Sequence, residues 1–332
     1  MATEPTRNLA LELVRVTEAA ALSAGRFMGR GDKNAADRAA VDSMRIVLNS
    51  IMMNAIIVIG EGEKDEAPML FNGERVGSGE GPEMDIAVDP IDGTRPLSNG
   101  SSSAISTVAL APRGTMFDPG PFMYMNKIAV GPQAKGVVDI QASTDHNLKA
   151  IARAAGKQVD DLTIVILDRT RHEDLIAEVR KAGARIRLIP DGDVAGALMT
   201  AWPDSGIDVL MGIGGTPEGV LAACALRAMG GEIQGKLYAR NEKILNRGRE
   251  MGYDFEKVLT MDDLVSSEDV FFAATGITDG EFLDGVKYTG SGARTDSLVV
   301  RGQTGTVRQI IATHRWDKLN RFSAIQYQAV KD

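Results

Sequence analysis

Residues 89–94 of the sequence, Asp-Pro-Ile-Asp-Gly-Thr, combine two carboxylates, a glycine and a hydroxyl directly after an apolar run. Pro90 fixes its own φ and favours a tight turn that would bring Asp89 and Asp92 within about 7 Å of each other. Carboxylate oxygens, with no histidine or cysteine nearby, suit a hard cation such as Mg²⁺ or Mn²⁺. Because the hydroxyl of Thr94 could orient a water beside such a cation, the segment predicts metal-assisted hydrolysis.

Three further acidic residues stand where strands are expected to end and helices to begin. Glu61 follows a short apolar run, and functional sites of α/β proteins gather at such strand ends. Glu218 and Asp37 each lie in the first turn of an expected helix, where the helix dipole favours a carboxylate. Each of the three, taken alone, is more often a cap or a surface charge, so only segment 89–94 indicates chemistry by itself.

Charged residues after two other expected strands favour an anionic, hydroxylated ligand. Arg169 and Arg171 could bind a phosphate bidentately, which a lysine cannot do. A solvated loop is an equally good interpretation of that pair from the sequence alone. Asp191 and Asp193 suit sugar hydroxyls, although capping of the following helix would also account for Asp193.

Other motifs exclude competing kinds of chemistry. The glycines of segment 212–219 could direct backbone N–H groups toward a phosphate, but Pro217 occupies the third-glycine position of a dinucleotide fingerprint. No Walker-type Gly-Lys-Ser/Thr motif occurs. The three histidines show no metal-ligand spacing, and Cys224 lies in an apolar run that predicts burial. Nucleotide binding and thiol catalysis are therefore not expected.

The composition of the 332 residues is that of a soluble globular protein, with 44% apolar and 25% charged residues. The single cysteine excludes an internal disulfide, no apolar stretch reaches the roughly 20 residues of a membrane span, and residues 1–8 lack a signal-peptide pattern. We therefore expect a cytoplasmic protein without a membrane partner. The net charge of −8 argues against nucleic acid, and it requires cations if the site is to attract phosphates.

The first part of the chain reads as helices packed on strands. Apolar residues at helical spacing predict helices at 8–28 and 34–52, the second with Asn34 as its N-cap. Short apolar runs separated by turns predict strands at 56–59, 85–89, 104–111, 123–130 and 136–142. This pattern predicts α+β organisation with a largely antiparallel sheet.

From about residue 145 helices and strands alternate. Helices are expected at 145–156, 173–183, 193–202 and 217–229, and strands at 163–168, 185–190, 207–211, 232–239, 269–275 and 297–312. Such βαβα patterning predicts a parallel or mixed α/β sheet. We therefore expect a metal-binding α+β domain over residues 1–145 and a substrate-binding α/β domain over residues 146–332.

Longer motifs resemble a known family. Segment 89–94 resembles the metal-binding signature of the inositol monophosphatase and fructose bisphosphatase superfamily, and the segments around it resemble the bacterial class II fructose-1,6-bisphosphatases. The resemblance covers roughly residues 8–315 and rests on Arg15-Val-Thr-Glu-Ala-Ala-Ala-Leu22, Gly29-Arg-Gly-Asp-Lys-Asn34, Val58-Ile-Gly-Glu-Gly-Glu63, Glu66-Ala-Pro-Met-Leu70, Pro190-Asp-Gly-Asp-Val194, Gly212-Ile-Gly-Gly-Thr-Pro-Glu-Gly219 and Ala274-Thr-Gly-Ile-Thr278.

This resemblance implies a layered αβαβα sandwich, assembled as a homodimer or homotetramer, that hydrolyses the 1-phosphate of fructose 1,6-bisphosphate in gluconeogenesis. The implied ligands of Mg²⁺ or Mn²⁺ are Asp37, Glu61, Asp89, Asp92 and Glu218. The implied catalytic residues are Thr94, which would orient the attacking water, its partner Asp37, and Glu61. The implied substrate-binding residues are Asp92, Gly93, Thr94, Tyr124, Arg169, Thr170, Arg171, Asp191, Gly192, Asp193 and Gly215.

The sequence departs from the family pattern in two places. Thr170 stands where the family commonly has proline, which bears on the rigidity of the arginine pair. Residues 96–103 differ from the usual sequence after the threonine, which bears on substrate preference. The alternatives are a sedoheptulose-1,7-bisphosphatase or an enzyme that accepts both sugars, an inositol monophosphatase, and, from a different class, a non-catalytic sensor of sugar phosphates or cations.

Overall fold

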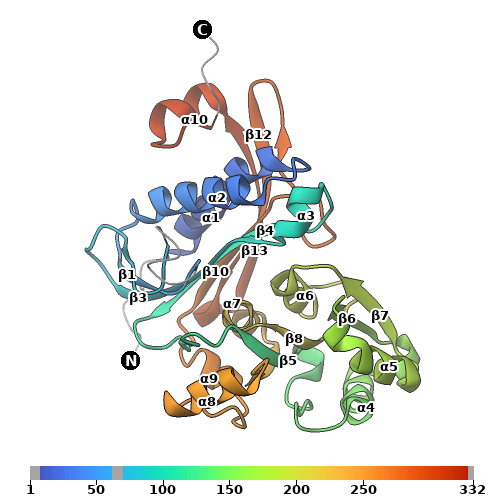
Figure 1. Cartoon of the computed structure of the whole chain (residues 1–332). Helices are drawn as coiled ribbons and strands as arrows, with labels where there is room; N and C mark the ends of the chain where they lie inside the picture. Colours follow the sequence, from blue (N-terminus) through green and yellow to red (C-terminus); the bar gives the residue numbers. More distant parts are fainter. Residues whose placement is uncertain (1–7, 62–69, 328–332) are drawn as a thin grey trace.

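The computed structural model describes residues 8–61 and 70–327, which fold as five alternating layers of helix and sheet (Figure 1). The layered α/β sandwich expected from the sequence is confirmed. Part of two family motifs falls in segment 62–69, outside the described residues. Within the described ranges, no helix combines the length and apolar character needed to cross a membrane.

The first layer consists of helices α1 (Ala10–Ala24) and α2 (Lys33–Leu48), which pack together on one face of the larger sheet. Their apolar residues recur at helical spacing, and a single buried cluster joins them to that sheet. Helix α2 begins after Asp32, whose side chain accepts a hydrogen bond from the Ala35 N–H (3.0 Å). Asp32 therefore caps the helix, and the prediction that Asn34 does so is wrong.

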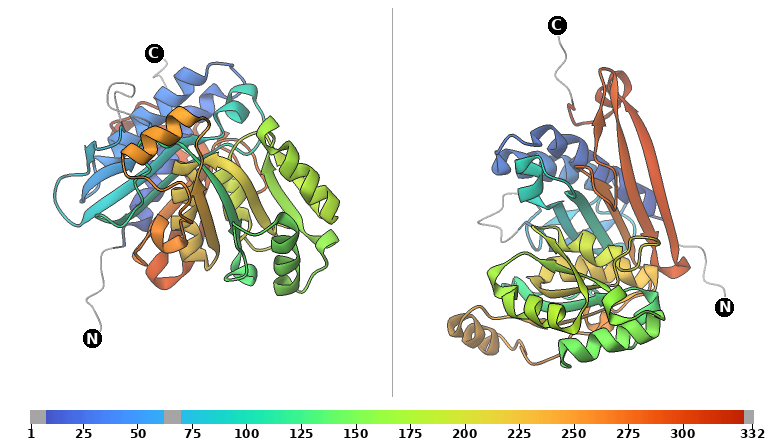
Figure 2. Two further views of the ribbon diagram at one scale, coloured as in Figure 1. Left: turned by 60° about the horizontal axis from the view of Figure 1, so that its bottom comes forward. Right: turned by 90° about the vertical axis from the view of Figure 1, so that its right-hand side faces the viewer.

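The larger sheet is largely antiparallel, as predicted, with one parallel pair between β1 and β3. Its strands come from both ends of the chain, and the hairpin of β12 and β13 runs along one side of the molecule (Figure 2). The strands are β1 (Asn54–Ile59), β2 (Arg75–Val76), β3 (Glu83–Asp92), β4 (Ile105–Pro112), β10 (Phe271–Gly276), β11 (Lys287–Tyr288), β12 (Gly292–Arg301) and β13 (Thr306–Arg315).

The smaller sheet is mixed, as the βαβα pattern predicts: β6 pairs in parallel with β7 and β8, and β5 pairs antiparallel with β8 and β9. The central helix α7 is buried nearly all round between the two sheets, beside α6. The strands and helices of this half are β5 (Tyr124–Val130), β6 (Thr163–Leu167), β7 (Arg185–Ile189), β8 (Val209–Gly215), β9 (Glu232–Leu237), α6 (Asp193–Met199) and α7 (Thr216–Met229), with α4 (Thr144–Ala155) and α5 (Glu173–Ala182) on the outer face.

Among the described residues, four further helices lie outside these layers, and the sequence pattern predicts none of them. They are α3 (Thr94–Asn99), α8 (Glu242–Glu250), α9 (Met261–Leu264) and α10 (Trp316–Phe322). Helix α3 matters for the site because it begins directly after segment 89–93.

Two strand predictions are wrong. Residues 136–142 form turns, because Asp139 is held by side-chain bonds: its N–H donates to Asn147 Oδ1 (2.9 Å) and its carbonyl accepts from Asn147 Nδ2 (2.8 Å). The single strand expected at 297–312 is a hairpin, which reverses through a short helical turn ending at Gly305 with φ of +57°.

A division of the chain near residue 145 stays a prediction. The two sheets exchange strands across that position, since β5 precedes it and lies in the smaller sheet, whereas β10 to β13 follow it and lie in the larger one. Each sheet therefore depends on residues from both parts of the chain.

Strand β3 carries a bulge where the sequence suggests a tight turn. Asp89 pairs with Thr107 and Asp92 pairs with Ile105, so β3 advances three residues while β4 advances two. The extra residue bends the strand and redirects its side chains. Segment 89–92 is therefore a bulged strand end, not a turn, and it presents its carboxylates at the edge where the sheets meet.

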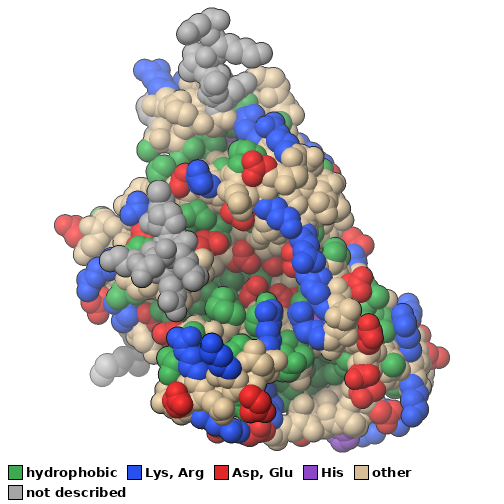
Figure 3. Space-filling view, in the orientation of Figure 1, with side chains coloured by type: hydrophobic (Ala, Val, Ile, Leu, Met, Phe, Trp, Pro, Cys, Tyr) green, Lys and Arg blue, Asp and Glu red, His purple; other side chains and the backbone are tan. Residues whose placement is uncertain are grey.

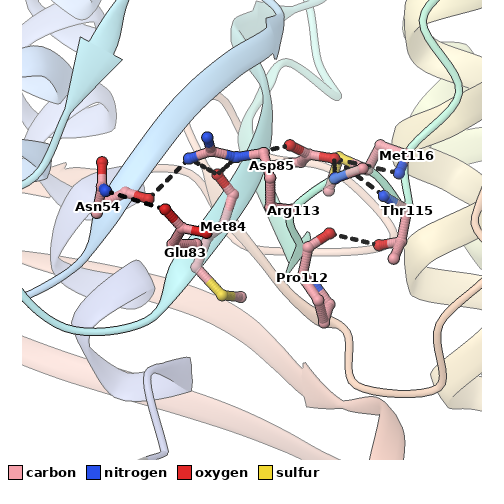
Figure 4. A network of polar contacts seen from close by, with 9 residues as sticks. Asn54, Glu83, Met84, Asp85, Pro112, Arg113, Thr115 and Met116 are labelled. Carbon is pink, nitrogen blue, oxygen red and sulfur yellow. Dashed lines mark hydrogen bonds and ion pairs between the residues drawn. The ribbon is translucent and has the colours of Figure 1, made fainter.

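The opposite end of β3 is fixed by an ion pair between the buried Asp85 and the half-buried Arg113 (Figure 4). Asp85, 2% exposed, accepts hydrogen bonds from the N–H groups of Gly114 (2.6 Å) and Thr115 (3.1 Å) and pairs with Arg113 (3.2 Å). Arg113 also donates to the Met84 and Asn54 carbonyls. One side chain pair therefore ties β1, β3 and the segment that follows β4 together.

Asp85→Ala should destabilise the protein by about 3 kcal/mol, because it leaves the Arg113 guanidinium and the backbone N–H groups of residues 114–116 without their acceptor. Glu83→Ala on the same strand is the matched control, since Glu83 is exposed and makes only a long contact to Asn54 (3.4 Å). Urea unfolding followed by circular dichroism measures both. Equal midpoints for the two variants would contradict the anchoring role of Asp85.

Candidate active site

A cleft of about 630 Å³ opens where the two sheets meet. Acidic side chains gather at the bottom of a hollow in this region, and basic side chains lie around it (Figure 3). The acidic residues that line the cleft are Glu61, Asp89, Asp92, Asp191 and Glu218. The structure therefore brings together four of the five expected metal ligands, and the fifth, Asp37, lies close enough to raise the pKa of Glu61.

The bulge of β3 supplies the two innermost carboxylates. Asp89 accepts a hydrogen bond from the Ile91 N–H (3.0 Å), and Asp92, 4% exposed, accepts one from the Ala195 N–H (3.3 Å) in α6. Burial raises the pKa of each carboxyl well above its ordinary value. Repulsion from Asp92 and Glu218 raises the pKa of Asp89 further. Repulsion from Asp193 and Glu218 does the same for Asp92. The fold thus holds two carboxyl groups in a place that disfavours their charge.

Glu61 enters the cleft from the end of β1, and Glu218 enters it from the first turn of α7. The Glu61 N–H donates to the Leu70 carbonyl (3.0 Å) at the end of β1, and its side chain keeps contact with solvent. Burial, then Asp37 and Glu218, raises the pKa of Glu61 to about 7. Burial and Asp193 likewise raise the pKa of Glu218 to about 7.

Glu218 also explains a glycine that the site requires. A Cβ at residue 215 would lie 1.7 Å from Glu218 Oε2, so only Gly215 lets the glutamate fold back over the start of α7. The carboxylate therefore lies at the N-terminus of a long buried helix, whose dipole favours its charged form against the effect of burial.

Thr94 lies next to Asp37, the partner that the family resemblance implies for it. Gly93, with φ of +101°, reverses the chain after the bulge, so that Thr94 becomes the first residue of α3. Its hydroxyl donates to the Ile91 carbonyl (3.2 Å) and lies near enough to the Asp37 carboxylate to lower the pKa that burial raises. Segments far apart in sequence, α2 and α3, thus meet beside the cleft.

The donors in this cleft suit a hard cation. They are carboxylates, mutual repulsion raises their pKa values, and a divalent cation would relieve that repulsion. Within residues 8–61 and 70–327, no three acidic, histidine or cysteine side chains lie close enough to form a ready-made metal site. The carboxylates are therefore neighbours that a cation would still have to draw together.

Lys127 is a charged residue beside the site that no motif of the sequence indicates. It is 2% exposed in β5, pairs with Asp193 (2.7 Å) and donates to the Gly215 carbonyl (3.0 Å). It also lowers the pKa of Glu218 through its charge. The feature of the sequence that could indicate it is a single lysine within the otherwise uncharged strand Tyr124–Val130, since a buried lysine needs a carboxylate partner.

The two arginines expected to bind a phosphate are both held by carbonyl groups. Arg169 donates to the carbonyls of Asp168 (2.9 Å) and Pro190 (2.6 Å), and Arg171 donates twice to the Ile213 carbonyl (3.1 and 2.7 Å). These bonds fix the guanidinium groups from outside the loop, so the absence of proline at residue 170 does not leave them loose.

His172 fixes this loop to β8. Its Nδ1 lies 2.7 Å from the Leu167 carbonyl, and its Nε2 accepts from the Ile213 N–H (2.8 Å). That arrangement assigns the neutral Nδ1–H tautomer, in agreement with the pKa of His172, which burial lowers. Gly212, with φ of +120°, leaves room for the ring. His172 and Arg171 both bind the backbone of Ile213, so the histidine helps to position the arginine.

Tyr124, an expected substrate-binding residue, lies close to two arginines. Arg171 Cζ lies 5.7 Å and Arg240 Cζ 3.7 Å from the centre of its ring. Arg240 precedes α8, and Arg247 of α8 lines the acidic cleft. The sequence analysis missed both arginines because no periodicity or motif links α8 to the site.

An αβαβα sandwich whose sheets meet at buried carboxylates, with arginines beside them, defines a metal-dependent phosphatase. The family model described as "Bacterial fructose-1,6-bisphosphatase, glpX-encoded" matches residues 7–314. The chain belongs to this family, the class II fructose-1,6-bisphosphatases, and is a phosphoric monoester hydrolase.

Curated relatives agree with this assignment. "Fructose-1,6-bisphosphatase 1 class 2" of Escherichia coli K12 is 46% identical over 325 residues, which cover 94% of this chain and 96% of the relative. The proteins named "Fructose-1,6-bisphosphatase class 2" from Escherichia coli O6:H1 and Shigella flexneri match with the same identity and coverage.

Glu218→Gln should stabilise the metal-free protein, and the gain should grow as the pH rises. Its pKa is raised from 4.5 to about 7 in the folded state, so the folded protein binds more protons than the unfolded chain between these values and loses stability as the pH rises through them. Thermal midpoints in EDTA at pH 5 and pH 8 measure the gain.

The same variant should lose most of the stabilisation by Mg²⁺ or Mn²⁺ and about 100-fold or more of its phosphatase activity. Glu173→Gln is the control, since Glu173 is also in the first turn of a helix but is exposed. Destabilisation of metal-free Glu218→Gln at pH 8 would contradict the interpretation that its charge is disfavoured there.

Proposed function

We propose that the protein hydrolyses the 1-phosphate of fructose 1,6-bisphosphate to give fructose 6-phosphate and phosphate, a step of gluconeogenesis, with Mg²⁺ or Mn²⁺ as cofactor. Family membership supports the substrate. The observation that carries the mechanism is the convergence of buried carboxylates from β3 and α7 beside the arginine loop. Acidic and basic groups side by side suit a phosphate bound through cations at one end and through guanidinium groups at the other.

The proposed metal ligands are Asp37, Glu61, Asp89, Asp92 and Glu218. A bound Mg²⁺ or Mn²⁺ supplies neutralisation of the phosphoryl charge and acidification of the attacking water. The ligands come from α2, β3, α7 and the end of β1, so bound cations would join the larger sheet to the helices on its two faces.

Thr94 is proposed to orient the attacking water. Because its hydroxyl hydrogen is donated to the Ile91 carbonyl or to Asp37, the lone pairs of Oγ1 are left to accept a hydrogen bond from a water. Such a water would present its own lone pair to the phosphorus. Asp37 and Glu61 serve as the catalytic carboxylates that hold this geometry and accept the proton.

The proposed substrate-binding groups lie on the smaller sheet and at the bulge. Arg169 and Arg171 would bind the phosphate that is kept, and Asp191 and Asp193 would accept hydrogen bonds from sugar hydroxyls. A Cβ at Gly192 would lie 3.8 Å from Asp92 Oδ2, which supports a close backbone approach there. The remaining proposed contacts are Asp92, Gly93, Thr94, Tyr124, Thr170 and Gly215.

We also propose a cytoplasmic homodimer or homotetramer that binds neither nucleic acid nor membranes. The supports are the net charge of −8, the buried cysteine and the lack of a spanning helix among the described residues. Light scattering at several protein concentrations tests the assembly.

Phosphate release tests the activity. We expect turnover of fructose 1,6-bisphosphate with Mg²⁺ or Mn²⁺ and none with EDTA. Sedoheptulose 1,7-bisphosphate and inositol 1-phosphate complete the panel, since the bisphosphate of the longer sugar is the alternative substrate. Absence of phosphate release from every sugar bisphosphate would contradict the proposal.

Thr94→Ala should lower kcat about 100-fold and change KM little, because the lost hydroxyl orients water and does not hold the sugar. Thr94→Ser keeps the hydroxyl and should retain most of the turnover. Steady-state phosphate release measures both constants. Full activity in Thr94→Ala would exclude the water-orienting role.

A further inference from the structure

Three arginines from two separate loops lie close together at one end of the smaller sheet. Arg169 and Arg171 follow β6, whereas Arg240 follows β9, and the charges of Arg169 and Arg240 both act on Arg171. Arg240 Cζ lies 3.7 Å and Arg171 Cζ 5.7 Å from the centre of the Tyr124 ring. Like charges repel, so a concentration of three cations favours binding of an anion.

Two of these cations lack an ion-pair partner. Arg169 pairs with Asp191 (3.4 Å), but neither Arg171 nor Arg240 forms an ion pair with any carboxylate in the part of the chain that the structure describes. Arg171 is held through neutral groups, two bonds to the Ile213 carbonyl and the face of Tyr124. Their guanidinium charges therefore remain to be neutralised by a ligand.

The backbone holds Arg240 in place from both sides. The Tyr238 N–H donates to the Tyr124 carbonyl (2.8 Å) two residues before it, and Asn241 caps α8 directly after it by accepting from the Ile244 N–H (3.0 Å). A cation–π contact with Tyr124 restricts the long side chain further. Arg240 is thus positioned over Tyr124, although it is exposed.

The same strand ends connect this cluster to the acidic cleft. Tyr124 pairs with Gly215, and Gly215 directly precedes α7, which carries Glu218 in its first turn. A ligand that reaches both places must carry two anionic groups, one among the carboxylates with cations and one among the arginines.

We propose that Arg240 determines specificity for sugar bisphosphates by binding the phosphate that is not hydrolysed, together with Arg169 and Arg171. This inference rests on the proposed function, because it assigns a further residue to the same substrate. Arg240 adds a third guanidinium from the loop after β9 to the two from the β6 loop, and it donates charge-assisted hydrogen bonds to the phosphoryl oxygens.

Arg240→Gln tests the proposal with two ligands. Fructose 6-phosphate carries only the phosphate that is not hydrolysed. Its Kd, measured by calorimetry, should therefore rise at least about tenfold. Fructose 1-phosphate carries only the other phosphate, so its KM and kcat for phosphate release should stay unchanged. Arg240→Lys should recover part of the affinity, because it restores the charge without the planar fork.

Arg249→Gln is the matched control, since it removes the same charge from the exposed surface of α8, outside the cleft. A thermal midpoint equal to that of the wild type shows that Arg240→Gln folds. Unchanged binding of fructose 6-phosphate, or equal losses for both monophosphates, would overturn the proposal. Turnover of fructose 1,6-bisphosphate by the wild type is measured separately, and its absence would instead contradict the proposed function.

Discussion

The central constraint on this structure is the mutual repulsion among the carboxylates that the fold holds near one another in the cleft. Asp89, Asp92 and Glu218 lie in places where burial and neighbouring charge disfavour ionisation, and the packing of two sheets around α7 leaves them little freedom to separate. Packing elsewhere stabilises the protein and offsets the free energy that this repulsion costs. A divalent cation reverses the sign of the interaction, so the same crowding that raises the pKa values of these carboxyls becomes a source of affinity for metal.

Several contacts elsewhere in the fold fix the positions of these groups. At one end of β3 the Asp85–Arg113 pair sets the register, and at the other end the bulge directs the carboxylates into the cleft. On the facing sheet Lys127 joins Asp193 to the start of α7. Asp85 and Asp193 are thus held by basic side chains, whereas Arg169 and Arg171 are held largely by backbone carbonyls.

Local chemistry was readable from the sequence, whereas long-range pairing was not. Segment 89–94 indicated a cation site because its residue types are specific, and the change of rhythm near residue 145 indicated a mixed second sheet. The bulge was missed because Pro90 favours a turn locally, and only pairing with β4 draws the segment into the sheet. Lys127 and Arg240 were missed because their partners, Asp193 and Tyr124, are more than sixty residues away along the chain.

The composition of the larger sheet has a consequence for synthesis of the chain. Strand β4 lies between β3 and β10, and β10 emerges from the ribosome on the order of ten seconds after β4 at ordinary rates of translation. Until then β4 is an open, apolar edge, which is a template for association with other chains. The nascent protein therefore carries an aggregation hazard in its first third, and chaperone dependence during expression should be concentrated there.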